Sequence, residues 1–194
     1  MAQNKRGDLM VAQGLPPYVE MARRGDLFTV QTATPFAPIT ALPTTTAKLE
    51  IKNNHASKHM IVDRIWTWQL LGTAVVWQST PWAQVGNAVV SAVTALVVYK
   101  SNSVEPYTSV LGSDAVTAID QSVIANGWTV FGGSTTSWGL AAATPGGATV
   151  GNVEGRLIVP PGKALHVTVT GSVATASSTH CGASWWLSDI TNNN

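Results

Sequence analysis

Hydrophobic and polar positions alternate with a period of two along much of the chain after residue 47. The segment 48–52 (KLEIK) alternates charged and aliphatic residues, and the segment 60–71 (MIVDRIWTWQLL) continues the pattern with Trp66 and Trp68 on one face and Ile65 and Thr67 on the other. This periodicity is typical of β-strands with one buried face. Gly, Pro and Asn turn signals separate further strand candidates, at 74–78, 89–99, 128–131, 153–159, 164–170 and 183–189.

Only one segment has helical spacing. In 114–126 (DAVTAIDQSVIAN) apolar residues recur every three to four positions, Asp114 can cap the start and Gly127 follows as a stop. Many short strands with at most one short helix predict an all-β fold, an antiparallel, jelly-roll-like β-sandwich. We expect it to span residues 48–194.

Residues 1–47 differ from the rest and predict an extended N-terminal arm. Five of the ten prolines lie there, and proline fixes φ and removes a backbone donor. The arm also carries too many apolar side chains for a free linker. These need a surface to lie on, either the arm's own domain or a neighbouring subunit.

The arm contains a short repeat: residues 6–13 (RGDLMVAQ) and 24–31 (RGDLFTVQ) share five of eight positions. One interpretation is two similar turns, with glycine for backbone freedom and aspartate as a local cap. A second is a pair of equivalent hooks that dock on equivalent grooves, with Arg6, Asp8, Arg24 and Asp26 as the candidate hook residues. A third, integrin-type recognition through RGD, rests on the tripeptide alone.

Composition narrows the functional classes. Charged residues make up 11% of the 194 positions, against about 25% in ordinary globular proteins, and the net charge is +1. A disordered chain or a nucleic-acid-binding protein would need more charge. The longest apolar run, 88–98, has 11 residues where a membrane span needs about 20. The N-terminus shows no secretory signal. We expect synthesis in a cytosol, no membrane span and no nucleic-acid partner.

No pattern of catalytic or cofactor-binding residues emerges, so we expect no enzyme, cofactor or metal. The single cysteine, Cys181, excludes an internal disulfide, and its neighbour His180 lacks the second pair of ligands a zinc site needs. His55 and His59 fall in a turn, where their spacing has no metal-binding meaning, and we expect them to be solvated. His166 is expected on the surface face of its strand.

Eight tryptophans are the strongest signal in the chain. Trp185 and Trp186 are consecutive on a strand and must face opposite sides, so one of them should meet the arm or another subunit. Together with apolar residues of the arm they define the candidate subunit interface: Leu15, Tyr18, Phe28, Phe36, Trp66, Trp68, Trp185 and Trp186. Alternatively, tryptophans on loops stack against sugars, with Trp82, Trp128 and Trp138 as candidates.

Two segments, 49–66 (LEIKNNHASKHMIVDRIW) and 156–171 (RLIVPPGKALHVTVTG), each consist of a strand, a turn and a second strand. On these segments the chain resembles bacteriophage virion structural proteins of the single β-sandwich type, among them capsid, minor capsid and decoration proteins. The resemblance implies a protein of the virion, made in the host cytoplasm, that assembles with copies of itself and with other virion proteins. It carries no catalytic residues over. Our guess for the symmetry is a trimer.

Charged residues are unevenly distributed along the chain, and the stretches without charge indicate where contacts are expected. Residues 65–99 and 121–153 contain no charged side chain. We therefore expect subunit contacts in these stretches and through the arm. The alternative function is a carbohydrate- or host-surface-binding module of a viral fibre. A hydrolase on the same scaffold has no nucleophile, metal or carboxylate cluster to support it.

Overall fold

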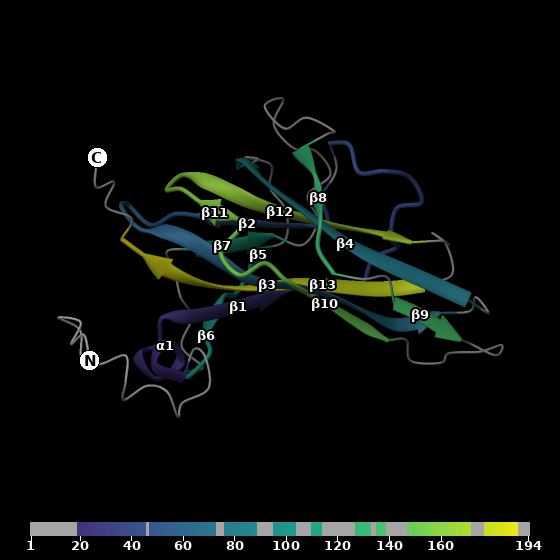
Figure 1. The fold of residues 1–194 in the computed structure, drawn as a ribbon, viewed down its shortest axis with the longest axis horizontal. Coiled ribbons are helices and arrows are strands. Elements are labelled where there is room, and N and C mark those ends of the chain that lie inside the picture. The colour runs from purple at the N-terminus through teal and green to yellow at the C-terminus, as the bar shows by residue number, and fades with distance from the viewer. Residues whose placement is uncertain are drawn as a thin grey trace, which may run out of the picture.

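The computed structural model describes residues 19–45, 47–72, 76–88, 95–103, 110–113, 127–132, 135–138, 147–171 and 177–189. Two antiparallel sheets pack face to face, as Figure 1 shows. This confirms the predicted all-β sandwich.

The first layer is a six-stranded sheet that contains the two longest paired strands in its centre. Its order is β10-β3-β13-β1-β6, with β11 also pairing β3. The bounds are β10 Ala148–Asn152, β3 His59–Gly72, β13 Ser177–Ser188, β1 Leu27–Gln31, β6 Tyr99–Lys100 and β11 Ile158–Val159.

The second layer is a seven-stranded sheet built around β12. Its order is β5-β7-β2-β12-β4-β8, with β9 also pairing β4. The bounds are β5 Ala95–Leu96, β7 Val110–Ser113, β2 Leu49–Asn53, β12 Lys163–Gly171, β4 Val76–Asn87, β8 Thr129–Val130 and β9 Thr135–Trp138.

The core lies between the two inner faces, where every second residue of the long strands points inward. In β3 the inward positions Ile65 and Thr67 are fully buried, whereas Trp66 and Trp68 on the other face are only partly so. The predicted alternation of this strand is therefore confirmed. The largest fully buried apolar side chains are Trp185, Leu49, Ile51, Met60, Ile65, Leu165, Val62, Val98 and Val153.

A bulge in β3 places Asp63 between two register positions of β13. Arg64 pairs with Ser184 and Val62 with Trp185, so Asp63 is the extra residue. Its carbonyl oxygen accepts the N–H groups of Val153 and Glu154, at 2.7 and 2.9 Å. The bulge thereby anchors the turn that follows β10.

The described part of the predicted arm lies on the arm's own domain. Strand β1 pairs with β13, and its side chains Phe28 and Val30 enter the core. Farther along, Phe36 exchanges two backbone hydrogen bonds with Thr179, both 2.9 Å, and Ile39 bridges to Thr170. A short helix, α1 (Val19–Arg24), precedes β1 inside the region that we expected to be extended.

One predicted strand is divided in the structure and another is shortened. The described end of 89–99 forms β5 in one sheet and β6 in the other, because the chain crosses between the layers at Val97 and Val98. Within 153–159 only β11 is a strand, since Glu154 and Gly155 adopt positive φ in a turn. The predicted helix 114–126 lies outside the described residues.

Candidate functional site

The outer face of the six-stranded sheet carries partly exposed aromatic side chains in register across its strands. Val150 of β10 pairs with Trp66 of β3, Trp66 with Gly182 of β13, and Gly182 with Gln31 of β1. These four residues form one row across the sheet. Val150 is 53% exposed.

The indole of Trp66 lies across the backbone of Gly182. A Cβ atom at Gly182 would stand only 2.4–2.7 Å from three atoms of the Trp66 ring, Cζ2, Cε2 and Nε1. Real Cβ atoms do not approach so closely, so the ring can occupy this place only because residue 182 has no side chain. With one ring face against the sheet, the opposite face points away from it.

Trp68 occupies the next outward position on β3 and stacks on His180. The ring centroids are 5.1 Å apart and the planes 20° from parallel. The Nδ1 atom of His180 lies 3.0 Å from the carbonyl oxygen of Thr32 and 3.1 Å from its hydroxyl. Since a carbonyl only accepts, Nδ1 carries the proton toward Thr32. His180, within the described part of β13, is therefore held on both sides.

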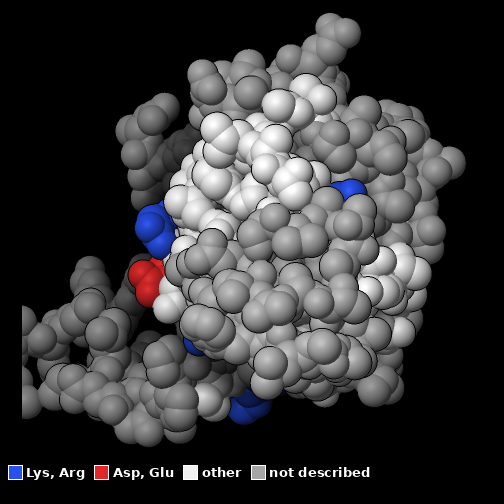
Figure 2. Space-filling view, turned by 90° about the vertical axis from the view of Figure 1, so that its right-hand side faces the viewer, with Lys and Arg blue, Asp and Glu red and all other residues white. Residues whose placement is uncertain are grey.

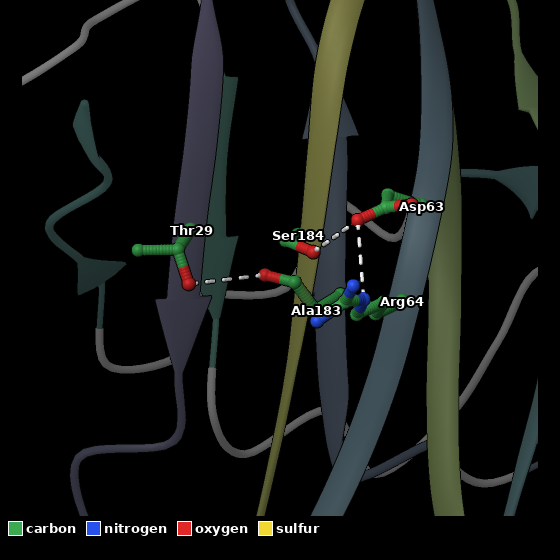
Figure 3. A network of polar contacts seen from close by, with 5 residues as sticks. All are labelled: Thr29, Asp63, Arg64, Ala183 and Ser184. Carbon is green, nitrogen blue, oxygen red and sulfur yellow. Dashed lines mark hydrogen bonds and ion pairs between the residues drawn. The ribbon is translucent and has the colours of Figure 1, made fainter. Parts of the chain in front are cut away.

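One polar network interrupts the aromatic face. The Asp63 carboxylate lies 3.5 Å from Arg64 Nε and accepts a hydrogen bond of 3.5 Å from the Ser184 hydroxyl. On the neighbouring strand Thr29 donates to the carbonyl of Ala183 (Figure 3). Because the acidic and basic groups neutralise each other, the network adds no net charge to the face. Figure 2 looks onto one end of the molecule, where the described surface is mostly uncharged, with a few basic and acidic side chains at its margin.

A pocket opens on this face where β1 meets the segment that leads into β6. Its volume is about 450 Å³. We call it the Trp66 pocket; six residues give it its aromatic and polar lining, Thr29, Gln31, Thr32, Trp66, Tyr99 and His180, and the others are apolar. No Asp, Glu, Lys or Arg lines it.

At the opposite side of the same sheet, β10 ends the order of described strands. We call residues Ala148–Asn152 the β10 edge. The edge has no charge and no proline, and its residues alternate exposed and buried without a bulge. Natural edge strands usually carry charges, prolines or bulges that block pairing with another chain. The β10 edge carries none of these within its own five residues, and one charged group reaches its end, where Arg156 donates a hydrogen bond to the carbonyl of Asn152.

The structure separates the predicted interface residues into core and surface. Phe28 and Trp185 are 3% and 0% exposed and stack on each other inside the sandwich, so their assignment to a subunit interface is wrong: both inner faces need large apolar groups to fill the core. Phe36, Trp66, Trp68 and Trp186 are partly exposed.

Two of the four candidate hook residues lie within the described part of the chain. Arg24 and Asp26 are exposed at the start of β1, and Gly25 between them adopts φ +74°. Leu15, Tyr18, Arg6 and Asp8 lie outside the described residues.

His166 was expected on the surface and is fully buried. It does point away from the core, but that face of the seven-stranded sheet is covered too, and Glu50 and Gln84 beside it are each 5% exposed. Burial lowers the pKa of His166 to about 4, against a smaller opposing effect of the hydrogen bond between Nε2 and the Asn87 carbonyl. At neutral pH the imidazole is uncharged, and its 3.5 Å approach to Glu50 is a polar contact between a neutral ring and the carboxyl group.

The other candidate ligands have structural roles. Cys181 is fully buried in the core, and burial raises the pKa of its thiol well above the usual range. His55 accepts the backbone N–H groups of Ser57 and Lys58 through Nδ1, at 3.2 and 3.0 Å, and so shapes a turn. His59 is partly buried in β3. Within the described ranges no three His, Cys, Asp or Glu side chains gather where they could hold a metal ion.

Of the tryptophans proposed for sugar stacking on loops, two donate hydrogen bonds within the fold and the third has no described side chain. Trp128 is 8% exposed and donates its indole N–H to the carbonyl of Thr44 at 2.7 Å. Trp82 lies in β4 and donates to the hydroxyl of Thr170 at 2.9 Å. The side chain of Trp138 is not described. A sugar site on Trp128 is therefore excluded.

No model of a known protein family matches this sequence, and no curated protein is detectably similar to it. Among the described helices, none combines the length and the apolar character needed to cross a membrane.

Sequence reasoning missed several residues of the outer face, namely Thr29, Gln31, Tyr99, Val150 and Gly182. A signal was present for the first segment, since Phe28 and Val30 alternate with Thr29 and Gln31. In 148–152 the pattern would have placed Val150 on the buried face, the reverse of what is found. The proline-rich surroundings of the first and the glycine-rich surroundings of the second favoured irregular structure instead.

Proposed function

We propose that this protein is a non-enzymatic structural component of a virus particle that assembles with copies of itself. The observation that carries the proposal is the β10 edge, an uncharged strand at the margin of an aromatic outer face. Val150, at its centre, is 53% exposed. A strand edge whose own residues carry no charge, proline or bulge favours pairing with another chain.

The occupant we propose for the β10 edge is the β10 edge of a second copy. Two antiparallel strands that pair along all five residues bring Val150 of one copy opposite Val150 of the other, because it is the central residue of Ala148–Asn152. The joined sheet then continues through both copies. Such a twofold contact is self-complementary and closes on itself.

The charge distribution supports the same proposal. Compared with the rest of a protein surface, the centres of contact surfaces are depleted of charged residues. The five residues of the β10 edge contain no ionisable group, and Arg64, which pairs with Asn152, is neutralised by Asp63. The threefold symmetry guessed from the sequence stays a prediction and would use another surface.

Light scattering on the purified full chain tests the proposal. We expect an oligomer or a larger particle for the wild type and a shift toward monomer for Val150→Lys, because two lysines directly opposite each other across a strand pair repel. Val130→Lys is the matched control, since Val130 is 47% exposed at the margin of the other sheet. A wild type that stays monomeric at all concentrations, or a Val150→Lys variant that assembles like the wild type, would contradict the proposal.

A further inference from the structure

We propose that the Trp66 pocket binds a neutral sugar ring. From Trp66 the pocket extends toward β1 and β6, whereas the β10 edge lies on the other side of β3. The proposal therefore does not depend on the proposed assembly. It also differs from a sugar site on the loop tryptophans, because Trp66 projects from the middle of a strand.

The first support is the position of the Trp66 indole. Its inner face rests on Gly182, which leaves the outer face as a flat aromatic surface beside the pocket. The face of an aromatic ring is electron-rich. One side of a pyranose ring presents several C–H groups with partial positive charge, and these pack well against such a surface.

The second support is the second aromatic side chain. Tyr99 is 43% exposed and pairs with Thr29 in the register of β6 and β1. Its phenol combines an apolar ring with a hydroxyl that donates and accepts hydrogen bonds. A sugar held at Trp66 would meet this second aromatic group at the β6 side of the pocket.

The third support is the uncharged polar lining. The amide of Gln31 and the hydroxyl of Thr29 lie on the pocket side of β1 and suit the hydroxyl groups of a sugar. His180 is fixed by Thr32 and by stacking on Trp68, so the floor is preorganised. No charged side chain lines the pocket, and this favours a neutral ligand over an acidic sugar or a phosphate. A volume of about 450 Å³ accommodates one ring and part of a second.

The binding test uses the full chain and saturation-transfer NMR with methyl glycosides of glucose, galactose, mannose and N-acetylglucosamine. Sialic acid serves as the acidic probe. A second arm presents oligosaccharides of the same sugars on an array, which distinguishes a free monosaccharide from the end of a glycan chain. We expect at least one neutral sugar to bind in one arm and sialic acid to bind in neither. Absence of any neutral ligand in both arms, or equal binding of sialic acid, overturns the proposal.

Three substitutions locate the site. Trp66→Ala removes the aromatic surface, and Gly182→Ala displaces the indole without removing any aromatic group. Each should weaken binding by about tenfold or more, which corresponds to about 1.4 kcal/mol. Gln31→Ala, at an exposed position, should weaken it by about threefold and is the variant least able to disturb folding. Trp82→Phe on the other sheet is the matched control and should bind like the wild type.

Thermal unfolding of each variant separates lost binding from lost structure. Undiminished binding in a folded Trp66→Ala or Gly182→Ala variant overturns the proposal, as does undiminished binding in Gln31→Ala if those two fail to fold. Val150→Lys should keep the sugar affinity of the wild type whatever its assembly state. Failure of the assembly proposal therefore stays distinguishable from failure of this one.

Discussion

Phe28 of β1 stacks on Trp185 of β13, with ring centroids 6.1 Å apart and planes 24° from parallel. The two residues are 157 positions apart in the sequence and lie in neighbouring strands of one sheet. This pair joins the N-terminal region to the last strand of the sandwich. It makes β1 part of the core rather than part of a detachable arm.

Phe28→Ala should lower the free energy of unfolding by about 3–5 kcal/mol, because it removes a buried ring and leaves a cavity against Trp185. Chemical denaturation monitored by tryptophan fluorescence measures the loss. Thr29→Ala on the outer side of the same strand should cost less than about 1 kcal/mol, since the hydrogen bond that its hydroxyl donates to the carbonyl of Ala183 is long, at 3.5 Å. Equal losses for the two variants would show that β1 is not packed as described.

The strands that could be predicted from the sequence are those whose two faces differ. In β3 the partly exposed Trp66 and Trp68 alternate with the buried Ile65 and Thr67, and the period of two reports this directly. Trp185 and Trp186 facing opposite sides followed from the same geometry. Local pattern therefore defined the centre of the six-stranded sheet.

The pattern could not show what covers a face or which distant segment pairs with it. His166 alternates correctly with Leu165 and Val167, yet both faces of its strand are buried, so alternation did not mean exposure. Pairing of β1 with β13 is a contact between opposite ends of the chain, which no local spacing encodes. The position of Trp66 across Gly182 depends on such a pairing too, although the glycine was visible in the sequence.

Acidification should destabilise the fold through His166. The pKa of this residue is about 4 in the folded protein and 6.5 ordinarily, so the unfolded chain takes up a proton first as the pH falls. Burial of the neutral His166 makes a pH-dependent contribution of roughly 3 kcal/mol to the free energy of unfolding. This contribution is complete above pH 6.5 and is lost progressively as the pH falls from 6.5 to about 4. Urea unfolding at a series of pH values measures it.

His166→Gln removes this titration, so its stability should fall less steeply than that of the wild type across the same interval. Parallel profiles for wild type and His166→Gln would show that the buried imidazole is not the titrating group.

Cys181 should resist alkylation in the folded protein. Burial raises the pKa of the thiol, and only the thiolate reacts rapidly. Mass spectrometry after treatment with iodoacetamide should find the native chain unmodified at neutral pH and the chain in guanidinium chloride fully modified. Rapid modification of the native protein would mean that the core opens around β13.

Oxidative cross-linking of a cysteine introduced at position 150 tests the central proposal most directly, because it reports which strands of two copies lie side by side. Cys181 is buried and gives no background. If β10 pairs with β10, Val150→Cys should form covalent dimers under mild oxidation, whereas Val130→Cys at the margin of the other sheet should stay monomeric. A Val150→Cys variant that remains monomeric, or one that cross-links no more than Val130→Cys, would contradict assembly through the β10 edge.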